Sequence, residues 1–302
     1  MTASFAIDTF TVTPSSGTNG SLSPSTPQSV NYGGTKSFLL LPDAGYHTAL
    51  VTGCNGSLSG NVYTIGPATT SCTVTASFEV DTYLVVPSAG ANGSLSPSTA
   101  QSVNYNGTTS FTVTPNTGYH IALVTGCSGT LSGNTYTTGA VTGTCIVTAS
   151  FAIDTFTVTP SAGMNGSLSP SAPQSVNYNG TTSFLVLPNT GYHTGTVSGC
   201  NGTLSGNVYS TGTVTTSCTV TATFAVDSYT VTPTAGSGGS ISPNTGQSVN
   251  YNGTTSFTLT PSTGYHILDV TGCGGTLTGN SYTTGAVSGN CTVSALYAAN
   301  SY

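Results

Sequence analysis

Residues 110–120 read Ser-Phe-Thr-Val-Thr-Pro-Asn-Thr-Gly-Tyr-His, and this stretch decides the fold class. From Ser110 to Thr114 apolar residues alternate with serine or threonine, which is the period-two pattern of a β-strand with one buried face. The proline, asparagine and glycine that follow are typical of a turn after a strand. Since no segment of the chain shows helical periodicity, the sequence predicts an all-β fold.

The stretch recurs in four copies, with a period of 73 residues and without insertion or deletion. Its Tyr-His pair stands at Tyr46-His47, Tyr119-His120, Tyr192-His193 and Tyr265-His266. A period this regular indicates a tandem array of modules, each with about six short antiparallel strands. The predicted domains are a surplus junction strand at 1–9 and repeats at 10–82, 83–155, 156–228 and 229–302.

Each module contains two cysteines that lie 18 positions apart. Repetition favours the pairing in which every module closes on itself. The predicted disulfides are Cys54–Cys72, Cys127–Cys145, Cys200–Cys218 and Cys273–Cys291. Each disulfide should contribute about 3 kcal/mol to the stability of its module, which is small for a single hydrophobic core.

Because zinc sites need closer ligand pairs and usually four ligands, we predict no metal and no cofactor. Disulfides indicate an extracellular or cell-surface location.

Charge is scarce in this chain, because Lys36 is the only cation and there are seven carboxylates. Without a basic patch the chain should bind neither nucleic acid nor an anionic membrane surface. No apolar run is long enough to span a bilayer, and the first residues lack the pattern of a secretory signal. We therefore expect a mature form or an excised fragment.

Consecutive modules are joined without a linker rich in Pro or Gly, as the segment 148–157 shows. We therefore expect closely coupled modules that form an elongated rod. The inter-repeat junctions carry one aspartate each, at Asp8, Asp81, Asp154 and Asp227. We predict that this aspartate makes a turn or cap hydrogen bond that fixes the angle between modules. Calcium needs more oxygen ligands, and only Glu79 adds a second carboxylate.

Several short motifs resemble the divergent B-repeat modules related to those of internalin B. They are Asn-Gly-Ser-Leu-Ser-Pro at 92–97, Val-Asn-Tyr at 103–105, Thr-Pro-Asn-Thr-Gly-Tyr-His at 114–120 and Thr-Val-Thr-Ala-Ser-Phe at 73–78. Such modules occur in tandem in bacterial surface and secreted proteins. The resemblance covers all four repeats and implies an extracellular β-rich repeat used as a stalk, spacer or adhesive segment. It carries over no catalytic residues.

The four histidines raise the question of catalysis, because each module combines one His with many Ser and Thr and a junction Asp. A catalytic triad needs these groups in contact, and nothing in the spacing indicates that contact. We interpret Gly-Tyr-His as a turn with a packed Tyr and a hydrogen-bonding or exposed His, and we predict that the protein is not an enzyme. Two alternative functions rest on other features of the sequence. The sixteen tyrosines suggest an adhesin that binds a surface glycan, and the Thr-x-Thr pairs suggest an ice-binding protein.

The first ten residues align with the last ten, because 302 residues exceed four periods by ten. The N-terminal strand is therefore surplus, and an apolar strand without a partner tends to pair with an exposed sheet edge. The residues of this candidate assembly strand are Thr2, Ala3, Ser4, Phe5, Ala6 and Ile7. The expected partner is a second copy in a head-to-tail homopolymer, or neighbouring repeats of a longer chain. The sequence thus predicts a non-enzymatic structural protein of a bacterial surface, either a rigid repeat stalk or a filament subunit.

Overall fold

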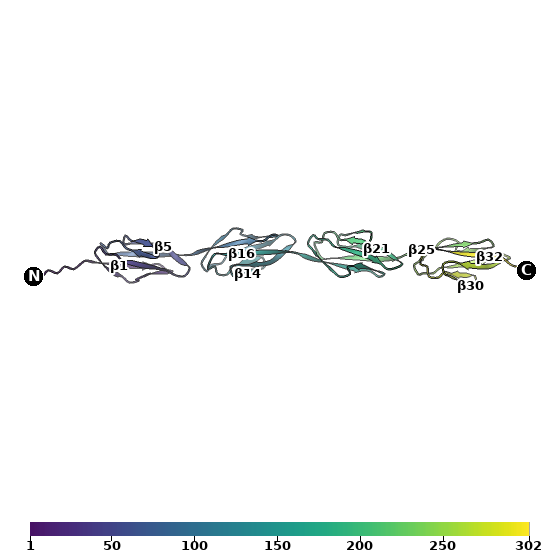
Figure 1. Cartoon of the computed structure of the whole chain (residues 1–302), viewed down its shortest axis with the longest axis horizontal. Helices are drawn as coiled ribbons and strands as arrows, with labels where there is room; N and C mark the ends of the chain where they lie inside the picture. Colours follow the sequence, from purple (N-terminus) through teal and green to yellow (C-terminus); the bar gives the residue numbers. More distant parts are fainter. Residues whose placement is uncertain (302) are drawn as a thin grey trace. The chain divides into compact units, whose positions relative to one another are not determined.

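The computed structural model describes residues 1–301, and its strands confirm the predicted all-β class. These residues contain no helix, and hence none that is long and apolar enough to cross a membrane. The strands gather into four modules that follow the order of the chain (Figure 1). Two compact units, Met1–Ile153 and Asp154–Tyr302, each contain two of these modules.

Every module has eight short strands, bounded by the turns that the Gly, Asn and Pro residues predict. Module 1 contains β1 Thr9–Ser16, β2 Gly20–Ser23, β3 Gln28–Asn31, β4 Ser37–Pro42, β5 Tyr46–Thr52, β6 Ser57–Ser59, β7 Val62–Thr64 and β8 Cys72–Val80. Module 2 contains β9 Thr82–Ala89, β10 Gly93–Ser96, β11 Gln101–Asn104, β12 Ser110–Pro115, β13 Tyr119–Thr125, β14 Thr130–Ser132, β15 Thr135–Thr137 and β16 Cys145–Ile153.

The second unit repeats this pattern. Module 3 contains β17 Thr155–Ala162, β18 Gly166–Ser169, β19 Gln174–Asn177, β20 Ser183–Pro188, β21 Tyr192–Ser198, β22 Thr203–Ser205, β23 Val208–Ser210 and β24 Cys218–Val226. Module 4 contains β25 Ser228–Ala235, β26 Gly239–Ser242, β27 Gln247–Asn250, β28 Ser256–Pro261, β29 Tyr265–Thr271, β30 Thr276–Thr278, β31 Ser281–Thr283 and β32 Cys291–Ala299.

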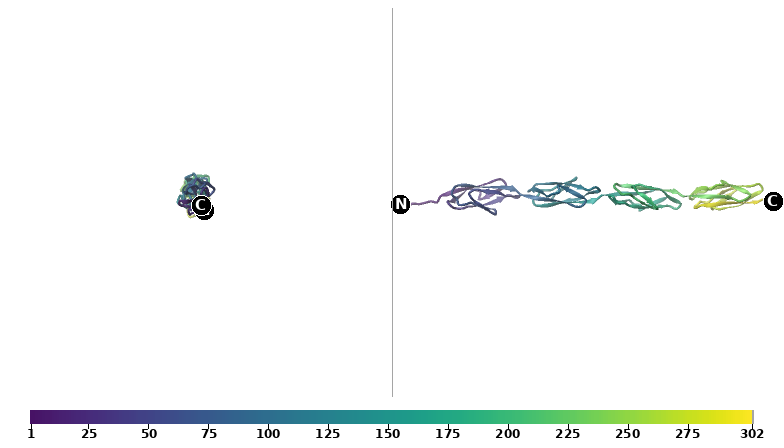
Figure 2. Two further views of the ribbon diagram at one scale, coloured as in Figure 1. Left: turned by 90° about the vertical axis from the view of Figure 1, so that its left-hand side faces the viewer. Right: turned by 90° about the horizontal axis from the view of Figure 1, so that it is seen from above.

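The eight strands of a module form two four-stranded sheets. The right-hand view of Figure 2 shows the modules from a second side. In module 1 the strand order is β3-β1-β8-β5 in sheet 1 and β2-β4-β7-β6 in sheet 2. The other modules have the same two orders, with all labels raised by eight from one module to the next. Sheet 1 therefore holds the first and the last strand of each module, which are the strands that lead to its neighbours.

The core of each module lies between its two sheets. In module 1 the fully buried Val12 and Val74 of sheet 1 join Phe38 of sheet 2 in one cluster. Phe111 and Val113, from the stretch that predicted the fold, occupy the same place in module 2, while Thr112 between them points to solvent. In β12 the period-two pattern thus places the apolar residues in the core and the hydroxyl side chains outside.

Two details of the strands differ from the prediction. Each module has eight strands, whereas about six were expected. The difference arises because β6 and β7 have only three residues each, which is too short for a strand pattern to show in the sequence. The prediction of purely antiparallel pairing was also wrong, since β1 pairs with β8 in parallel from Val12↔Cys72 to Ser16↔Ala76. The chain between these strands passes through sheet 2, and such a long connection permits parallel pairing. As a result, the chain leaves each module at the end opposite to the one where it enters.

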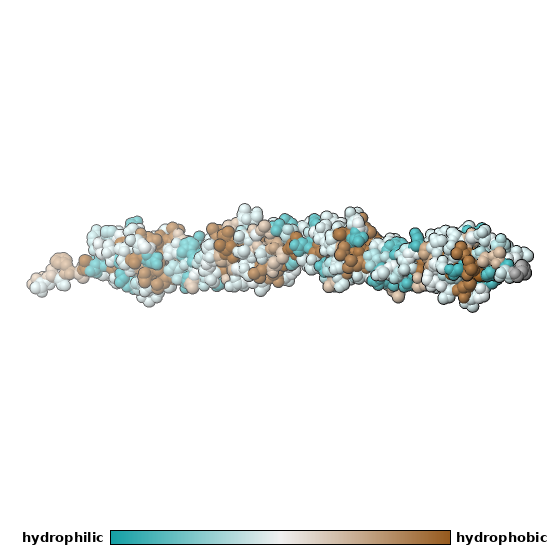
Figure 3. Space-filling view, turned by 45° about the vertical axis from the view of Figure 1, so that its right-hand side comes forward, coloured by the Kyte–Doolittle hydropathy of each residue, from teal (hydrophilic) through white to brown (hydrophobic). Residues whose placement is uncertain are grey.

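The outer face of sheet 2 alternates in character from module to module. In module 1 Leu39, Leu41 and Val62 of this face are 42%, 43% and 39% exposed. Module 2 has threonines at the corresponding positions Thr112, Thr114 and Thr135, and module 4 has Thr258, Thr260 and Ser281. Module 3 resembles module 1, with exposed Leu185, Leu187 and Val208. Apolar areas therefore interrupt a surface of hydroxyl and amide groups (Figure 3).

Residues 1–8 form no strand, and β1 begins at Thr9, so the predicted junction strand at 1–9 is not formed here. Phe5 and Ile7 in this segment are 94% and 60% exposed. The corresponding residues of module 1 lie in the second half of β8, where they pair with β5. A β-strand needs such a neighbour for its backbone hydrogen bonds, and within the described part of the chain residues 1–7 belong to no sheet.

Candidate functional site

The junction between modules 1 and 2 consists of a single residue, because β8 ends at Val80 and β9 begins at Thr82. This residue is Asp81, one of the four predicted junction aspartates. Its N–H donates a 2.8 Å hydrogen bond to the Gly45 carbonyl of module 1, and its own carbonyl accepts a 2.8 Å bond from the Tyr105 N–H of module 2. Backbone hydrogen bonds thus hold the linking residue to both modules.

The side chain of Asp81 makes a further contact, with the histidine of the Gly-Tyr-His motif. His47 Nδ1 lies 2.8 Å from Asp81 Oδ1, and the two side chains are 55% and 30% exposed. Because solvent screens so open a pair, its contribution to stability is small. The pair instead holds the start of β5 next to the junction residue. The interpretation of Gly-Tyr-His as a turn was wrong for its last two residues, because Tyr46 and His47 open strand β5. His47 is nevertheless exposed and hydrogen-bonded, as predicted.

An aromatic ring covers the glycine of the same motif. Gly45 has φ of +79°, and a Cβ at this position would overlap the Tyr105 ring of the next module. Tyr105 also packs against Tyr83, with ring centroids 6.5 Å apart. Gly45 is therefore required both by its left-handed backbone and by the ring that lies on it. We refer to Gly45, His47, Asp81 and Tyr105 as the junction cluster.

The second unit contains the same cluster between modules 3 and 4. It consists of Gly191, His193, Asp227 and Tyr251. His193 Nδ1 lies 2.7 Å from Asp227 Oδ1, the Asp227 N–H donates to the Gly191 carbonyl over 2.9 Å, and the Tyr251 ring covers Gly191. The recurrence of every contact indicates that the cluster is a built feature of the junction.

The backbone hydrogen bond to a tyrosine N–H also recurs at the two other predicted aspartates, Asp8 and Asp154. The Asp8 carbonyl accepts a 2.8 Å hydrogen bond from the Tyr32 N–H, and the Asp154 carbonyl accepts one of 2.8 Å from the Tyr178 N–H. At the end of module 4 Asn300 stands in the aspartate position, and its Oδ1 lies 3.1 Å from His266 Nδ1. Burial raises the pKa of the nearby Tyr297 hydroxyl, which stays protonated as the donor in a 2.6 Å bond to the Ser240 carbonyl.

The histidine and aspartate of the junction cluster are two of the three groups of a hydrolytic triad. Within residues 1–301, no serine or threonine hydroxyl is hydrogen-bonded to His47 or His193. The described residues also contain no group of three or more His, Cys, Asp or Glu side chains that could hold a metal. The contacts that the cluster does make join two consecutive modules.

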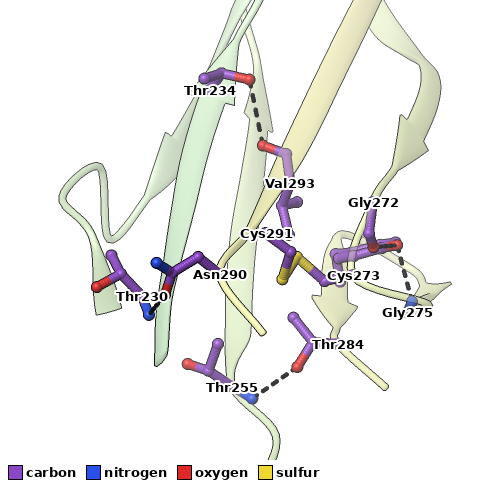
Figure 4. Close-up of a disulfide and its surroundings, with 11 residues drawn as sticks. Thr230, Thr234, Thr255, Gly272, Cys273, Gly275, Thr284, Asn290, Cys291 and Val293 are labelled. Atoms are coloured by element: carbon purple, nitrogen blue, oxygen red, sulfur yellow. Dashed lines mark hydrogen bonds between the residues drawn. A yellow bond between two sulfur atoms is a disulfide. The ribbon is translucent and has the colours of Figure 1, made fainter. Parts of the chain in front are cut away.

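Each module contains one disulfide with a Cα–Cα distance of 5.5 or 5.6 Å. The bonds are Cys54–Cys72, Cys127–Cys145, Cys200–Cys218 and Cys273–Cys291. Figure 4 shows the last of them at the start of β32, where the Thr230 N–H donates a 2.8 Å hydrogen bond to Asn290 Oδ1 beside Cys291. The disulfide therefore attaches the last strand of a module, which leads to the junction, to the turn after β29.

Sequence reasoning found the junction aspartates but missed their partners. His47 and Gly45 lie more than thirty residues before Asp81, and Tyr105 belongs to the following module. One signal was available, because Gly-Tyr-His and the junction aspartate recur with the same period. A shared period shows that two positions are equivalent in every repeat, but it does not show that they touch.

The comparison with known families agrees with this architecture. The Divergent InlB B-repeat domain matches residues 83–155, 156–228 and 229–301, which together make up most of the chain. The chain belongs to this family. Module 1 has the same two sheet orders and the same disulfide as the three matched B-repeats, so the structure contains four copies of the B-repeat fold.

Two solved structures also resemble the B-repeat chain. The Bacillus anthracis TIE protein is 6% identical over 92% of this chain and 65% of that protein, with a TM-score of 0.36. The pilus adhesin SpaC from Lactobacillus rhamnosus GG, in an open conformation, is 9% identical over 85% of this chain and 56% of its own, with a TM-score of 0.22. The B-repeat chain thus spans less than two thirds of either protein. No curated protein matches it in sequence.

The junction cluster leads to a prediction for Gly45→Ala. We expect the new methyl group to displace the Tyr105 ring and to strain the backbone at the positive φ, at a cost of about 1–2 kcal/mol. Hydrogen exchange at the Asp81 and Tyr105 amides should then become faster, by about tenfold, while core amides stay unchanged.

Gly60→Ala is the matched control for this experiment. Gly60 has φ of +57°, but no atom lies within 4 Å of the position that its Cβ would take. The control therefore keeps the backbone strain and lacks the clash with a ring. Equal acceleration at the Asp81 and Tyr105 amides in both variants would refute the role of the Tyr105 ring.

Proposed function

We propose that this chain is a non-enzymatic, extracellular B-repeat stalk that spaces other parts of a bacterial surface protein. The single observation that carries the proposal is the junction of one residue, Asp81, hydrogen-bonded through its backbone to the modules on both sides. A flexible connection would need several residues free of such bonds. The contacts at Asp227 are of the same kind.

The path of the chain through each module supports the same role. Parallel pairing of β1 with β8 makes the chain enter a module at one end and leave at the other. A module with this topology can be repeated without the chain turning back, as a spacer requires. Length can then be adjusted by the number of modules. The partners of this chain under the proposal are neighbouring modules of a longer protein.

The four disulfides support an extracellular location. Every cysteine of the described chain is paired, and disulfides persist mainly in oxidising compartments. Asn-Gly turns and hydroxyl side chains replace the charged residues that solvate most protein surfaces, since only 3% of the residues are charged. Such a surface offers few sites for electrostatic attraction, and this suits a spacer that should not adhere along its length.

The rigidity of the Asp81 junction can be tested by measuring the distance between two spin labels on the full chain with pulsed electron paramagnetic resonance. Spin labels on unnatural amino acids at Ser25 and Ser98, two exposed and equivalent loop positions in modules 1 and 2, leave the cysteines untouched. We expect a narrow distance distribution. Inserting Gly-Ser-Gly-Ser after Asp81 should broaden it strongly, because the inserted residues have no backbone partners.

The matched control places the same insertion after Gly133, in the exposed turn between β14 and β15. This insertion lies inside module 2 and leaves the junction as it is, so the distribution should stay narrow. A distribution that is already broad in the parent chain would contradict the stalk proposal.

A further inference from the structure

The first and the last strand of each module lie side by side in the centre of sheet 1. In module 1 the strand order β3-β1-β8-β5 places β1 and β8 between two edge strands. They run parallel over five residue pairs, from Val12↔Cys72 to Ser16↔Ala76, which we refer to as the parallel ladder. The equivalent strands of modules 2, 3 and 4 pair in the same register. Since the chain enters and leaves a module through these two strands, a pull along the chain acts on them directly.

The parallel direction decides how such a pull loads the hydrogen bonds between β1 and β8. Tension acts on the start of β1, at Thr9, and on the end of β8, at Val80. Because the paired residues lie between these two points, the strands are pulled past each other along their length. All bonds of the parallel ladder are then loaded at once, whereas two strands pulled apart from the same end lose their bonds one after another.

Two further hydrogen bonds lengthen the parallel ladder, one at each end. The Thr11 N–H donates to Ser71 Oγ over 3.0 Å, directly before the first pair. The Gly17 N–H donates to the Ala76 carbonyl over 2.9 Å, directly after the last pair. In the other modules the N–H equivalent to that of Thr11 also donates to a side-chain oxygen, which belongs to Thr144, Ser217 or Asn290. Figure 4 shows the bond to Asn290.

Pro14 lies within the paired part of β1 and has no N–H, yet it removes no hydrogen bond to β8. The N–H groups of Thr11 and Gly17 both point to β8. Along a strand the N–H groups of every second residue point to the same side, so those of Thr13 and Ser15 point to β8 as well. The missing N–H of Pro14 would point away from β8, towards β3, whose pairing with β1 ends before this residue. Proline is tolerated where no ladder donor is needed.

The inner face of the parallel ladder is closed to water. Val12, Val74 and Ala76 are at most 1% exposed and belong to the core cluster of module 1. The equivalent residues are buried to the same extent: Val85, Val147 and Ala149 in module 2, Val158, Val220 and Ala222 in module 3, and Val231, Val293 and Ala295 in module 4. Backbone hydrogen bonds that border a closed core open less readily than bonds that water can reach.

The disulfide determines which strand can move under such a load. The bond Cys54–Cys72 connects the first residue of β8 to the turn after β5. β8 therefore cannot slide past β5, its other neighbour in sheet 1, and the parallel ladder to β1 is the contact that must break. After that break the disulfide still closes the segment between its two cysteines, which are 18 positions apart, so this segment cannot extend.

We propose that each B-repeat resists tension, with the parallel ladder loaded in shear and the disulfide limiting the extension that follows its rupture. This mechanical role rests on the stalk function, because tension reaches a module only through a chain that connects two structures. It also goes beyond the stalk function, since a spacer keeps a distance without having to withstand a pull.

Optical tweezers on the oxidised full chain can pull module 1 in two directions. Handles on unnatural amino acids at the exposed Ile7 and Glu79 load β1 and β8 in shear. In the control the handle at Ile7 moves to the exposed Thr18, which lies beyond the pair Ser16↔Ala76, at the same end of the parallel ladder as Glu79. At the same loading rate, we expect module 1 to unfold at a severalfold higher force with the Ile7 handle. Equal forces in the two directions would overturn the mechanical role.

Two serine variants separate the parallel ladder from the rest of the module. Ser71→Ala removes the acceptor of the Thr11 N–H, whereas Ser37→Ala removes the 2.8 Å hydrogen bond to the Thr64 hydroxyl in sheet 2. Under constant force in the shear direction, Ser71→Ala should unfold module 1 about threefold to tenfold faster, because one bond of the ladder is lost. Ser37→Ala should unfold it at the parent rate. Equal rates for the two variants would contradict the role of the ladder.

Reduction with a dithiol reagent tests the part played by Cys54–Cys72. The unfolding step between the Ile7 and Glu79 handles should become about 60 Å longer, because 18 further positions can then extend at about 3.3–3.6 Å each. A step of unchanged length would refute the limit on extension. A low force in shear together with a narrow spin-label distance distribution would overturn the mechanical role alone, whereas a broad distribution would contradict the stalk itself.

Discussion

Replacing both Cys127 and Cys145 by alanine should destabilise module 2 by about 3 kcal/mol, which is a large share of the stability of one such module. The disulfide closes a loop of 18 positions and holds β16 beside the turn after β13. Its removal restores chain entropy to the unfolded module and frees the start of the strand that leads onward. Hydrogen exchange resolved by mass spectrometry should show faster exchange within residues 83–155.

The other three modules serve as internal references in that experiment. Each has its own disulfide and its own core cluster, so its protection should change little. The pair Cys200→Ala and Cys218→Ala should give the same result for module 3. Equal loss of protection in all four modules would contradict the view that each module is stabilised separately.

Phe111→Ala is expected to have the largest effect of any single substitution considered. The ring is 0% exposed and lies at the centre of the module 2 core, between the two sheets. Its truncation leaves a cavity that the short strands cannot close, at a cost of about 3–5 kcal/mol. Because a small domain has only about 5–15 kcal/mol in total, module 2 should lose a large share of its stability and unfold at a lower temperature than the other modules. Circular dichroism during thermal unfolding should show a separate, earlier transition.

Thr112→Ala is the matched control, since Thr112 is the next residue of β12 and points to solvent. It removes atoms from the same strand without opening a cavity, and its cost should stay within about 0.5 kcal/mol. An early transition in Thr112→Ala as well would mean that β12 itself is weak, independently of the core contacts of Phe111.

The all-β class, the four modules and the disulfide pairing could be predicted from the sequence. These properties are local or periodic: alternation along Ser110–Thr114 sets which residues face the core, and the fixed distance between cysteines repeats in every module. The parallel pairing of β1 with β8, the separate strands β6 and β7, and the contacts of Asp81 with Gly45, His47 and Tyr105 became visible only in the folded module. Those contacts join residues that are far apart in the chain. Which strands become neighbours depends on how the whole module packs, and this cannot be deduced from local sequence patterns.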